Sequence, residues 1–340
     1  MGRIFMTAIN AVFPIVALIM IGYFLRKKGF FTESFVKAGS KLVFQICLPA
    51  MLFTNVYEIS GMEAIRWDLA IYCVIAIVVL YALGVPVALL TTKDPKRRGV
   101  LWQVLYRSNF AIVGIPLASS LGGVEAVAAT AVTFTFVIPI YNIFSVIALS
   151  VFTGRSDSGK ADVKAIAKDV VTNPLTISVL LGLLCLVVRA AQQQIFGEVV
   201  FSLNVHTQFL YKVISNLSAI ASPFALIVLG GQCEFTAVKN MKKELIVGTL
   251  GRIVAAPLLV IGVAVLLTKY TNVINFGVNE MPALISLFGS PTAVSGAVMA
   301  AEMNNDEQLA TQLVVWTSAG SILTIFATVC CLMSMGFLRT

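Results

Sequence analysis

The sequence predicts an all-α integral membrane protein of ten transmembrane helices, arranged as two inverted five-helix repeats with broken crossing helices 4 and 9. Three observations support this fold class. Hydrophobic residues make up 59% of the 340-residue chain and charged residues only 12%, whereas soluble domains average about 25% charged residues. The apolar segments recur at the length of about 20 residues that crosses a bilayer. Prolines interrupt these segments at matching positions in the two halves of the chain.

The proline pattern is the least ordinary of these observations. The first three prolines of the pattern recur 174, 171 and 175 positions later, and the pairs are Pro49 and Pro223, Pro86 and Pro257, and Pro116 and Pro291. Proline removes a backbone hydrogen bond and clashes with the preceding turn. A membrane helix tolerates this where neighbouring groups or cavity water satisfy the freed backbone. Matching interruptions in two halves are typical of carriers, with the substrate site at the interruptions.

The apolar runs predict ten spans in order along the chain. They cover 6–25, 37–56, 69–92, 100–121, 125–152, 174–196, 208–230, 244–268, 281–302 and 309–336. The first run is predicted to be a retained span, because its basic cluster follows it, whereas a secretory signal carries charge before its apolar stretch. The spans divide the chain into a first five-helix repeat (1–153), a cytoplasmic linker (154–173) and a second, inverted repeat (174–340). The linker is too short and polar to be a domain and is typical of a flexible connection.

The basic residues predict the orientation. Sixteen of the 24 lie in or next to the loops after the first, third, fifth and seventh spans, and six lie on the opposite side. Because basic loops stay in the cytoplasm, both termini are predicted to lie outside. Each half then contains an odd number of spans, so the second half must be inverted relative to the first.

Several classes of protein and site are disfavoured. The net charge of +8 comes from short loops between apolar runs, which indicates topology and not nucleic-acid binding. The six cysteines form no CxxC pair and the chain has one histidine, His206, so no metal or disulfide framework is predicted. No cluster of acids, histidines or cysteines lies at membrane depth, so neither an enzyme nor a cofactor is expected. A membrane sensor would normally carry a soluble domain, and no segment here is long enough.

The fourth and ninth spans carry the predicted site. Gly114 and Pro116 predict a break in the fourth span. In the ninth, Ser290 is predicted to cap a half-helix whose first residue is Pro291. The N-terminus of such a half-helix carries about +0.5 charge and suits an anion. Two such termini from inverted repeats predict an anion site near the bilayer midplane. The alternative interpretation is a pair of kinked structural helices, since proline is common in membrane helices.

Eight residues are the candidate substrate-binding set, with Asn109 foremost because its amide both donates and accepts. They are Asn55, Asn109, Gly114, Pro116, Ser290, Pro291, Thr292 and Ser295. Polar residues of other spans, Tyr141 and Asn142 among them, could face the same cavity or form interhelical hydrogen bonds. Arg107 and Arg252 lie within spans and are interpreted either as snorkelling anchors or as an electropositive vestibule for anions.

These segments together resemble the auxin efflux carrier family, which includes plant auxin exporters and bacterial permeases for dicarboxylates such as malate and malonate. The matching segments run in the family's order over essentially the whole chain. They are Ala11 to Pro14, Gly22 to Gly29, Cys47 to Phe53, Arg107 to Leu117, Pro223 to Gly231, Ser290 to Ser295 and Asn304 to Asp306.

The resemblance implies crossing broken helices four and nine, and a scaffold domain and a transport domain that move relative to each other like an elevator. It maps the crossover prolines onto Pro116 and Pro291. Plant members carry an Asn-Pro-Asn type sequence at the crossing, where this chain has Gly-Ile-Pro and Ser-Pro-Thr, so auxin specificity does not carry over. The short linker is similar to that of the bacterial members.

The sequence therefore predicts a secondary carrier for a small organic anion in a plasma membrane, such as a bacterial inner membrane. The substrate is expected to be a mono- or dicarboxylate, such as malate or an auxin-like acid. No deeply buried carboxylate is available for a proton relay, so the coupling ion, H⁺ or Na⁺, is left open. The alternative is a sodium-coupled organic anion symporter of bile-acid-carrier-like architecture. The resemblance also implies a homodimer.

Overall fold

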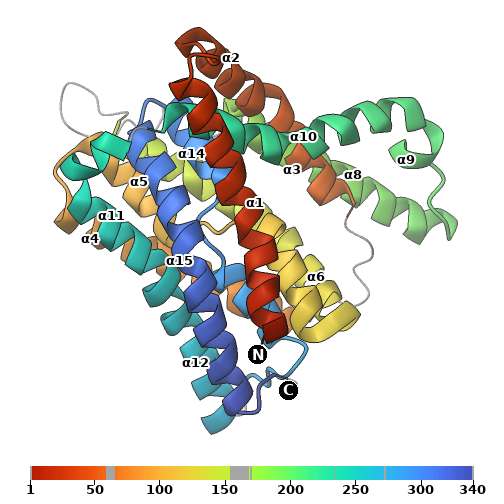
Figure 1. Ribbon diagram of the computed structural model, residues 1–340. Coiled ribbons are helices and arrows are strands. Elements are labelled where there is room, and N and C mark those ends of the chain that lie inside the picture. The colour runs from red at the N-terminus through yellow and green to blue at the C-terminus, as the bar shows by residue number, and fades with distance from the viewer. Residues whose placement is uncertain are drawn as a thin grey trace.

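The computed structural model describes residues 2–58, 66–153, 168, 171–233, 235–271 and 273–338. The predicted linker, 154–173, lies almost wholly outside these ranges. Within them the regular structure is entirely helical, and the only extended pairing is an isolated antiparallel bridge between Ser108 and Thr292. The helices pack side by side in a bundle, with the two ends of the chain at the same end of the molecule (Figure 1).

The first half contains α1 (Gly2–Lys27), α2 (Glu33–Leu42), α3 (Leu48–Tyr57), α4 (Trp67–Thr91), α5 (Pro95–Tyr106) and α6 (Ile115–Val151). The second half contains α8 (Pro174–Phe196), α9 (Leu203–His206), α10 (Gln208–Gln232), α11 (Lys242–Leu250), α12 (Ala256–Tyr270), α13 (Met281–Leu284), α14 (Val294–Glu302) and α15 (Glu307–Ser334). Four π-helical segments and a 3₁₀ turn join some of these helices. They are η1 (Val43–Cys47), η2 (Phe110–Gly114), η4 (Gly251–Ala255) and η5 (Ile285–Gly289), with the 3₁₀ turn η3 (Phe235–Asn240).

Six continuous helices in the described part of the chain are long and apolar enough to cross a membrane. They cover Glu33–Tyr57, Trp67–Thr91, Pro174–Phe196, Gln208–Gln232, Lys242–Tyr270 and Glu307–Ser334, close to six of the ten predicted spans. The remaining four predictions fall on α1, on the broken segments around α5 and α14, and on α6, which bends at Gly123 with φ of 65°. The all-helical membrane fold is therefore confirmed, while the ten-span count and the inverted repeat stay predictions.

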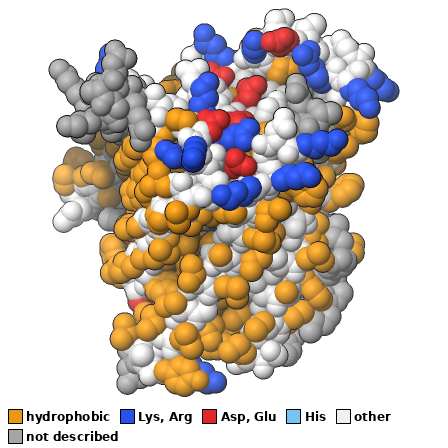
Figure 2. Space-filling view, turned by 90° about the vertical axis from the view of Figure 1, so that its left-hand side faces the viewer, with side chains coloured by type: hydrophobic (Ala, Val, Ile, Leu, Met, Phe, Trp, Pro, Cys, Tyr) orange, Lys and Arg blue, Asp and Glu red, His pale blue; other side chains and the backbone are white. Residues whose placement is uncertain are grey.

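The surface separates into a charged end and an apolar belt. On the face shown in Figure 2, most basic and acidic side chains gather at one end, and hydrophobic side chains cover much of the remainder. Exposed leucine, isoleucine and valine side chains occur along α4, α8 and α12. Such an extensive apolar surface is typical of a protein surrounded by lipid, since soluble proteins rarely expose contiguous apolar patches of this kind.

Four of the six repeated prolines follow a π-helical segment. Segments η1, η2, η4 and η5 end two residues before Pro49, Pro116, Pro257 and Pro291, respectively. Because proline has no N–H, the carbonyl four residues before it loses its usual donor. At these four prolines that carbonyl lies inside the widened π-helical turn. Such local π adjustments give the freed carbonyl other partners. The other two, Pro86 and Pro223, lie inside the uninterrupted helices α4 and α10.

Two interrupted helices meet at the centre of the molecule, but their breaks differ from the predicted positions. In the first half the helix stops at Tyr106 and the chain is extended through Arg107–Asn109, so the break precedes Pro116, which lies in the first turn of α6. The prediction of a break at Gly114 and Pro116 was wrong, because the π-helical segment accommodates the proline.

The predicted cap of the second half-helix was also misplaced. Helix α14 begins at Val294 with Ala293 as its N-cap, so Ser290 is not the cap and Pro291 lies in the extended segment before the helix. Extended backbone at residues 290–293 separates η5 from α14. The residue preceding a proline is driven toward this extended conformation, which accounts for ψ of 151° at Ser290.

The two extended segments lie against each other, which we call the crossing (residues 107–109 and 290–293). Asn109 donates its backbone N–H to the carbonyl of Pro291 at 2.8 Å. Thr292 donates its hydroxyl to the carbonyl of Arg107 at 3.2 Å. These bonds and the Ser108–Thr292 bridge replace the helical hydrogen bonds that each segment lacks.

Arg252 fixes the ends of the helices that lead into the crossing. Its guanidinium donates to the carbonyl of Ser290 at 2.9 Å and to that of Leu287 at 3.0 Å, and it also reaches the carbonyls of Phe288, Leu105 and Tyr106. The side chain is fully buried, so its interpretation as a snorkelling anchor was wrong. It occupies the helix C-terminal ends of both halves, where unpaired carbonyls carry partial negative charge.

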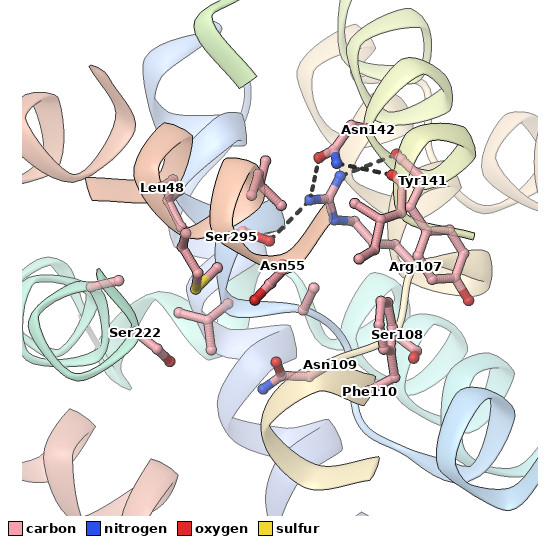
Figure 3. A pocket seen from close by; sticks show the side chains of 16 residues that line it. Leu48, Asn55, Arg107, Ser108, Asn109, Phe110, Tyr141, Asn142, Ser222 and Ser295 are labelled. Atoms are coloured by element: carbon pink, nitrogen blue, oxygen red, sulfur yellow. Dashed lines mark hydrogen bonds between the residues drawn. The ribbon is translucent and has the colours of Figure 1, made fainter. Parts of the chain in front are cut away.

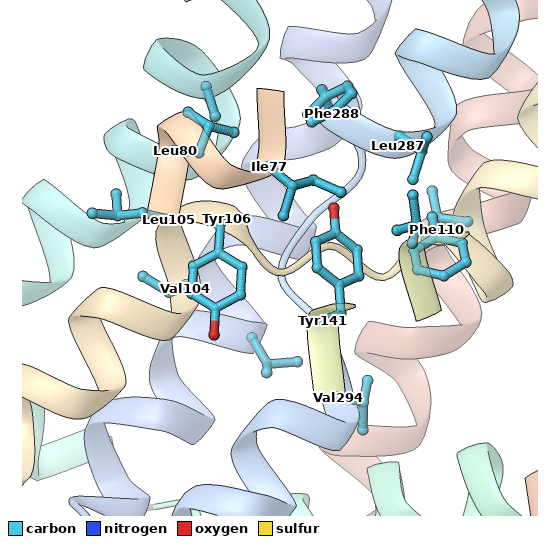
Figure 4. Packing of buried hydrophobic residues seen from close by; sticks show 14 of the residues in the cluster. Ile77, Leu80, Val104, Leu105, Tyr106, Phe110, Tyr141, Leu287, Phe288 and Val294 are labelled. Atoms are coloured by element: carbon cyan, nitrogen blue, oxygen red, sulfur yellow. The ribbon is translucent and has the colours of Figure 1, made fainter. Parts of the chain in front are cut away.

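An apolar core encloses this polar crossing. Figure 4 shows the extended segments passing between buried side chains of α4, α5, α6 and the ninth predicted span. Tyr141, Phe288 and Ile77 are each at most 2% exposed. The backbone of the crossing thus forms hydrogen bonds within the protein, as backbone at membrane depth must.

Candidate functional site

A small cavity lies beside the crossing, between two groups of helices (Figure 3). Helices α3 and α10 form one wall, and the crossing, α6 and α14 form the other. Its lining residues are Leu48, Met51, Leu52, Asn55, Arg107, Ser108, Asn109, Phe110, Ile138, Tyr141, Asn142, Ser222, Ala225, Ala293, Val294 and Ser295. The cavity has a volume of about 50 Å³, which is room for a few waters or for a group the size of a carboxylate.

Arg107 supplies the charge of this cavity. Its guanidinium donates to Asn142 Oδ1 at 3.0 Å, Ser295 Oγ at 2.9 Å and the Tyr141 carbonyl at 3.1 Å (Figure 3). It also donates to Ser145 Oγ at 2.5 Å. The residue is 3% exposed. All four partners are neutral. Arginine keeps its proton throughout the physiological pH range, so a full positive charge lies in the cavity wall.

No carboxylate balances this charge within the described residues. The ion pairs there involve Lys37, Arg66 and Arg97 at the ends of helices, and none of them reaches Arg107. A buried charge that is held only by neutral dipoles is costly. An anion entering the cavity would offset that cost.

The beginning of α14 adds to the positive potential. Val294 and Ser295 are the first two helical residues and both line the cavity. No side chain caps this helix end. The first backbone N–H groups of a helix have no intrahelical acceptor and carry a partial positive charge. Their proximity to Arg107 places two sources of positive potential at one cavity.

Further polar groups on the cavity wall lack partners in the structure, and two of them come from opposite walls. The amide Nδ2 of Asn109 and the hydroxyl of Ser222 are both buried without a hydrogen bond. Both residues line the cavity, Asn109 from the crossing and Ser222 from α10. Buried polar groups are nearly always hydrogen-bonded, so these unsatisfied groups indicate that a ligand or water completes the site. Asn55 of α3 lies beside them (Figure 3).

The eight predicted site residues separate into two groups. Asn55, Asn109 and Ser295 line the cavity. The others belong to the crossing and its packing. Ser290 donates to the carbonyl of Ser286 at 2.6 Å. Gly114 approaches Ser286 so closely that an added Cβ would lie 2.9 Å from its backbone oxygen.

The remaining predicted residues hold the crossing together. Pro291 and Thr292 take part in its hydrogen bonds, and Pro116 opens α6. Prediction from the sequence missed Ser222 entirely, and it left the role of Arg107 open. The available signals were the position of Ser222 directly before Pro223 and that of Arg107 two residues before Asn109.

Comparisons with known proteins agree over nearly the whole chain. The sequence is 24% identical over 326 residues to an uncharacterized transporter of Methanocaldococcus jannaschii, covering 94% of this chain and 97% of the relative. It is 22% identical over 328 residues to an uncharacterized transporter of Methanothermobacter thermautotrophicus, covering 95% and 97%.

A profile of a whole protein family gives the broader match. Residues 7–329 match the family described as membrane transport protein, which is the auxin efflux carrier family named by the sequence resemblance. The match spans both halves of the chain and every residue of the crossing and its cavity. Together with the apolar helices, it identifies a transporter and not an enzyme. The chain is therefore a member of the membrane transport protein family, the family of the auxin efflux carriers.

Proposed function

We propose that this protein is a secondary carrier for a small organic anion, a mono- or dicarboxylate, which binds in the cavity beside the crossing. The observation that carries the proposal is Arg107, a buried guanidinium with neutral partners only, on the wall of a cavity. A carboxylate matches the flat fork of a guanidinium. The unpartnered amide of Asn109 and the start of α14 supply further donors.

The position of the cavity supports alternating access of the elevator type. On one side, α10 packs against α1 and α3, and α3 packs against α8. On the other, α4, α5, α6, α11, α14 and α15 form a second group, against which α1 packs through α15 and α6. The cavity lies where these two groups meet. In the proposed mechanism the second group, which carries Arg107 and Asn109, slides along the first and exposes the site to each side of the membrane in turn.

Reciprocal ion pairs favour an inverted repeat of ten spans. Arg66, at the start of α4, pairs with Glu280, at the start of α13, at 2.5 Å. Arg97, in the first turn of α5, pairs with Glu244, in the first turn of α11, at 3.1 Å. In a repeat of five plus five spans, the third span corresponds to the eighth and the fourth to the ninth. One ion pair joins the third span to the ninth, and the other joins the eighth span to the fourth. Inverted repeats bring corresponding elements together in this reciprocal way. We further propose that the protein lies in a bacterial plasma membrane, with both termini outside, and that it forms a homodimer.

Transport by the purified protein in liposomes tests this function. Labelled carboxylates of different length and charge would be offered under imposed proton gradients and under imposed sodium gradients. We expect uptake of at least one small carboxylate, and uptake that strictly requires sodium would favour the sodium-coupled alternative. The variants Arg107→Gln and Asn109→Ala should reduce uptake at subsaturating substrate by at least about tenfold, which corresponds to about 1.4 kcal/mol of binding free energy.

Matched variants on the surface control for changes in expression and folding. Lys269→Gln removes a positive charge and Asn240→Ala removes an amide from exposed positions far from the cavity. Both should transport like the natural protein. Equal activity in Arg107→Gln, Asn109→Ala and these controls would mean that the anion binds elsewhere.

A further inference from the structure

The two buried arginines of the protein differ in how their charges are balanced. Arg252 donates to five carbonyls at the C-terminal ends of the helices that enter the crossing. Each helix C-terminus carries about half a negative charge, so two ends roughly offset one guanidinium. Arg107 instead contacts two hydroxyls, one amide oxygen and one carbonyl, and lies beside the positive end of α14.

The acidic residues in the described part of the chain offer Arg107 no internal counter-ion. They lie in loops, at helix ends or near the bend of α6, where Glu125 is exposed. Those that pair do so with Lys37, Arg66 and Arg97. The empty cavity therefore holds one uncompensated positive charge, and a bound carboxylate neutralises it.

We propose that the carrier works as an anion exchanger, in which the substrate is the counter-ion that allows Arg107 to cross the membrane. This inference rests on the proposed function. The partners of Arg107, on α6 and α14, belong to the same helix group as the crossing, so the charge moves with that group.

The physical reason is the cost of moving a desolvated charge. During the crossing step the cavity is closed and its water is scarce, so an empty site carries a bare positive charge through low-dielectric surroundings. An occupied site carries a guanidinium and a carboxylate that cancel. The occupied group therefore crosses much faster than the empty one. A carboxylate released on one side must be replaced by another carboxylate, the group whose shape matches the guanidinium fork, before the helix group returns.

Efflux from liposomes tests the exchange directly. Vesicles loaded with a labelled carboxylate that the protein transports are diluted into medium with or without the unlabelled compound, in chloride. Valinomycin and equal potassium on both sides hold the membrane potential at zero, so that charge build-up does not limit net flux. External substrate should accelerate efflux at least tenfold. Equal rates with and without external substrate would overturn the inference.

Two variants assign the effect to the charge of Arg107. Asn142→Asp places a carboxylate where the amide oxygen now accepts from the guanidinium at 3.0 Å, which neutralises the empty site without removing the arginine. The stimulation by external substrate should fall to less than twofold. Ser145→Ala removes a neutral partner of the same guanidinium and should keep the stimulation, even if its absolute rate falls.

A labelling measurement covers the case in which Asn142→Asp binds too little substrate to transport. Ser108→Cys provides a thiol in the cavity that moves with the crossing, and a membrane-impermeant reagent is applied to either side without substrate. With the natural Asn142 the thiol should react from one side only, because the empty site does not cross. With Asn142→Asp it should react from both sides. One-sided labelling in both proteins would contradict the inference.

These outcomes separate the inference from the proposed function. If no carboxylate is transported or bound, the proposed function fails and exchange fails with it. If a carboxylate is transported at the same rate with and without substrate on the far side, the proposed function stands and the inference is wrong.

Discussion

At the scale of single residues, the position of a hydroxyl relative to Arg107 decides whether it affects substrate affinity. Ser295 and Ser290 lie five residues apart, but only Ser295 faces the cavity and accepts from the guanidinium at 2.9 Å. Ser290 donates back to the carbonyl of Ser286 within its own segment. Both residues are serines of the predicted ninth span, so residue type alone does not distinguish them, whereas the direction of each side chain separates a cavity-lining hydroxyl from one in a structural hydrogen bond.

We therefore expect different effects when each serine is replaced by alanine. Ser295→Ala leaves one N–H group of Arg107 without its acceptor and lets the guanidinium reorient, so KM should rise by about tenfold, or about 1.4 kcal/mol. Ser290→Ala removes one neutral hydrogen bond and should lower the free energy of unfolding by about 1 kcal/mol with KM unchanged. Transport kinetics and thermal unfolding in detergent measure both. A larger change of KM in Ser290→Ala than in Ser295→Ala would reverse the assignment.

At the scale of helices, Arg252 holds the crossing together. It joins carbonyls from the ends of α5 and η5, which come from opposite halves of the chain. Nothing in the sequence identifies these partners, because they are backbone groups that become available only when both helices stop. A long basic side chain within a span suggests that its charged end extends to the membrane surface. The guanidinium of Arg252 is instead buried and donates to backbone carbonyls.

Removing this side chain should destabilise the protein. Arg252→Leu leaves several buried carbonyls without donors, so the free energy of unfolding should fall by at least about 3 kcal/mol. Arg252→Lys keeps the charge but reaches fewer carbonyls, so its free energy of unfolding should lie between those of the natural protein and Arg252→Leu. Thermal unfolding in detergent measures the order of stability of the three proteins. An Arg252→Leu protein as stable as the natural one would show that the crossing does not depend on these bonds.

The contact between α1 and α10 is a second element whose geometry is set by small residues. A Cβ on Gly22 would lie 1.9 Å from the Ile227 carbonyl oxygen, and one on Gly230 would lie 2.0 Å from that of Ile19. The two helices therefore touch backbone to backbone, as small residues permit in membranes. Gly230→Leu should separate them and lower the melting temperature, whereas Gly262→Leu, at an open position, should not. Equal melting temperatures would contradict this contact.

At the scale of the whole molecule, the sequence predicts the helical membrane class and which spans are interrupted, but not the residues at which the helices stop or how they do so. Composition and the repeated prolines mark where helices are disturbed, because both depend only on residue identity. Whether a proline bends, widens or ends a helix depends on tertiary partners. Pro86 and Pro223 lie within intact helices, Pro49 and Pro257 follow widened turns, and only the break at Pro291 coincides with its proline.

The orientation in the membrane is open to a labelling test. In a Cys331→Ser background, which removes an exposed native thiol, single cysteines replace Lys96, Lys239 or Lys269, all of which are exposed. The distribution of basic residues predicts that the first two react only from the cytoplasmic side and the third only from outside. Cysteines at positions 96 and 239 that react from opposite sides would exclude the inverted five-plus-five arrangement.

Arg107, buried and without a counter-ion among the described residues, is proposed to bind the carboxylate of the substrate. Equilibrium binding of a labelled carboxylate to the purified protein tests this proposal most directly, because binding does not depend on conformational cycling. Arg107→Gln should raise Kd at least about 30-fold, or about 2 kcal/mol, and Arg107→Lys should recover part of the affinity. An Arg107→Gln protein that remains folded and binds the carboxylate with unchanged Kd would contradict the account.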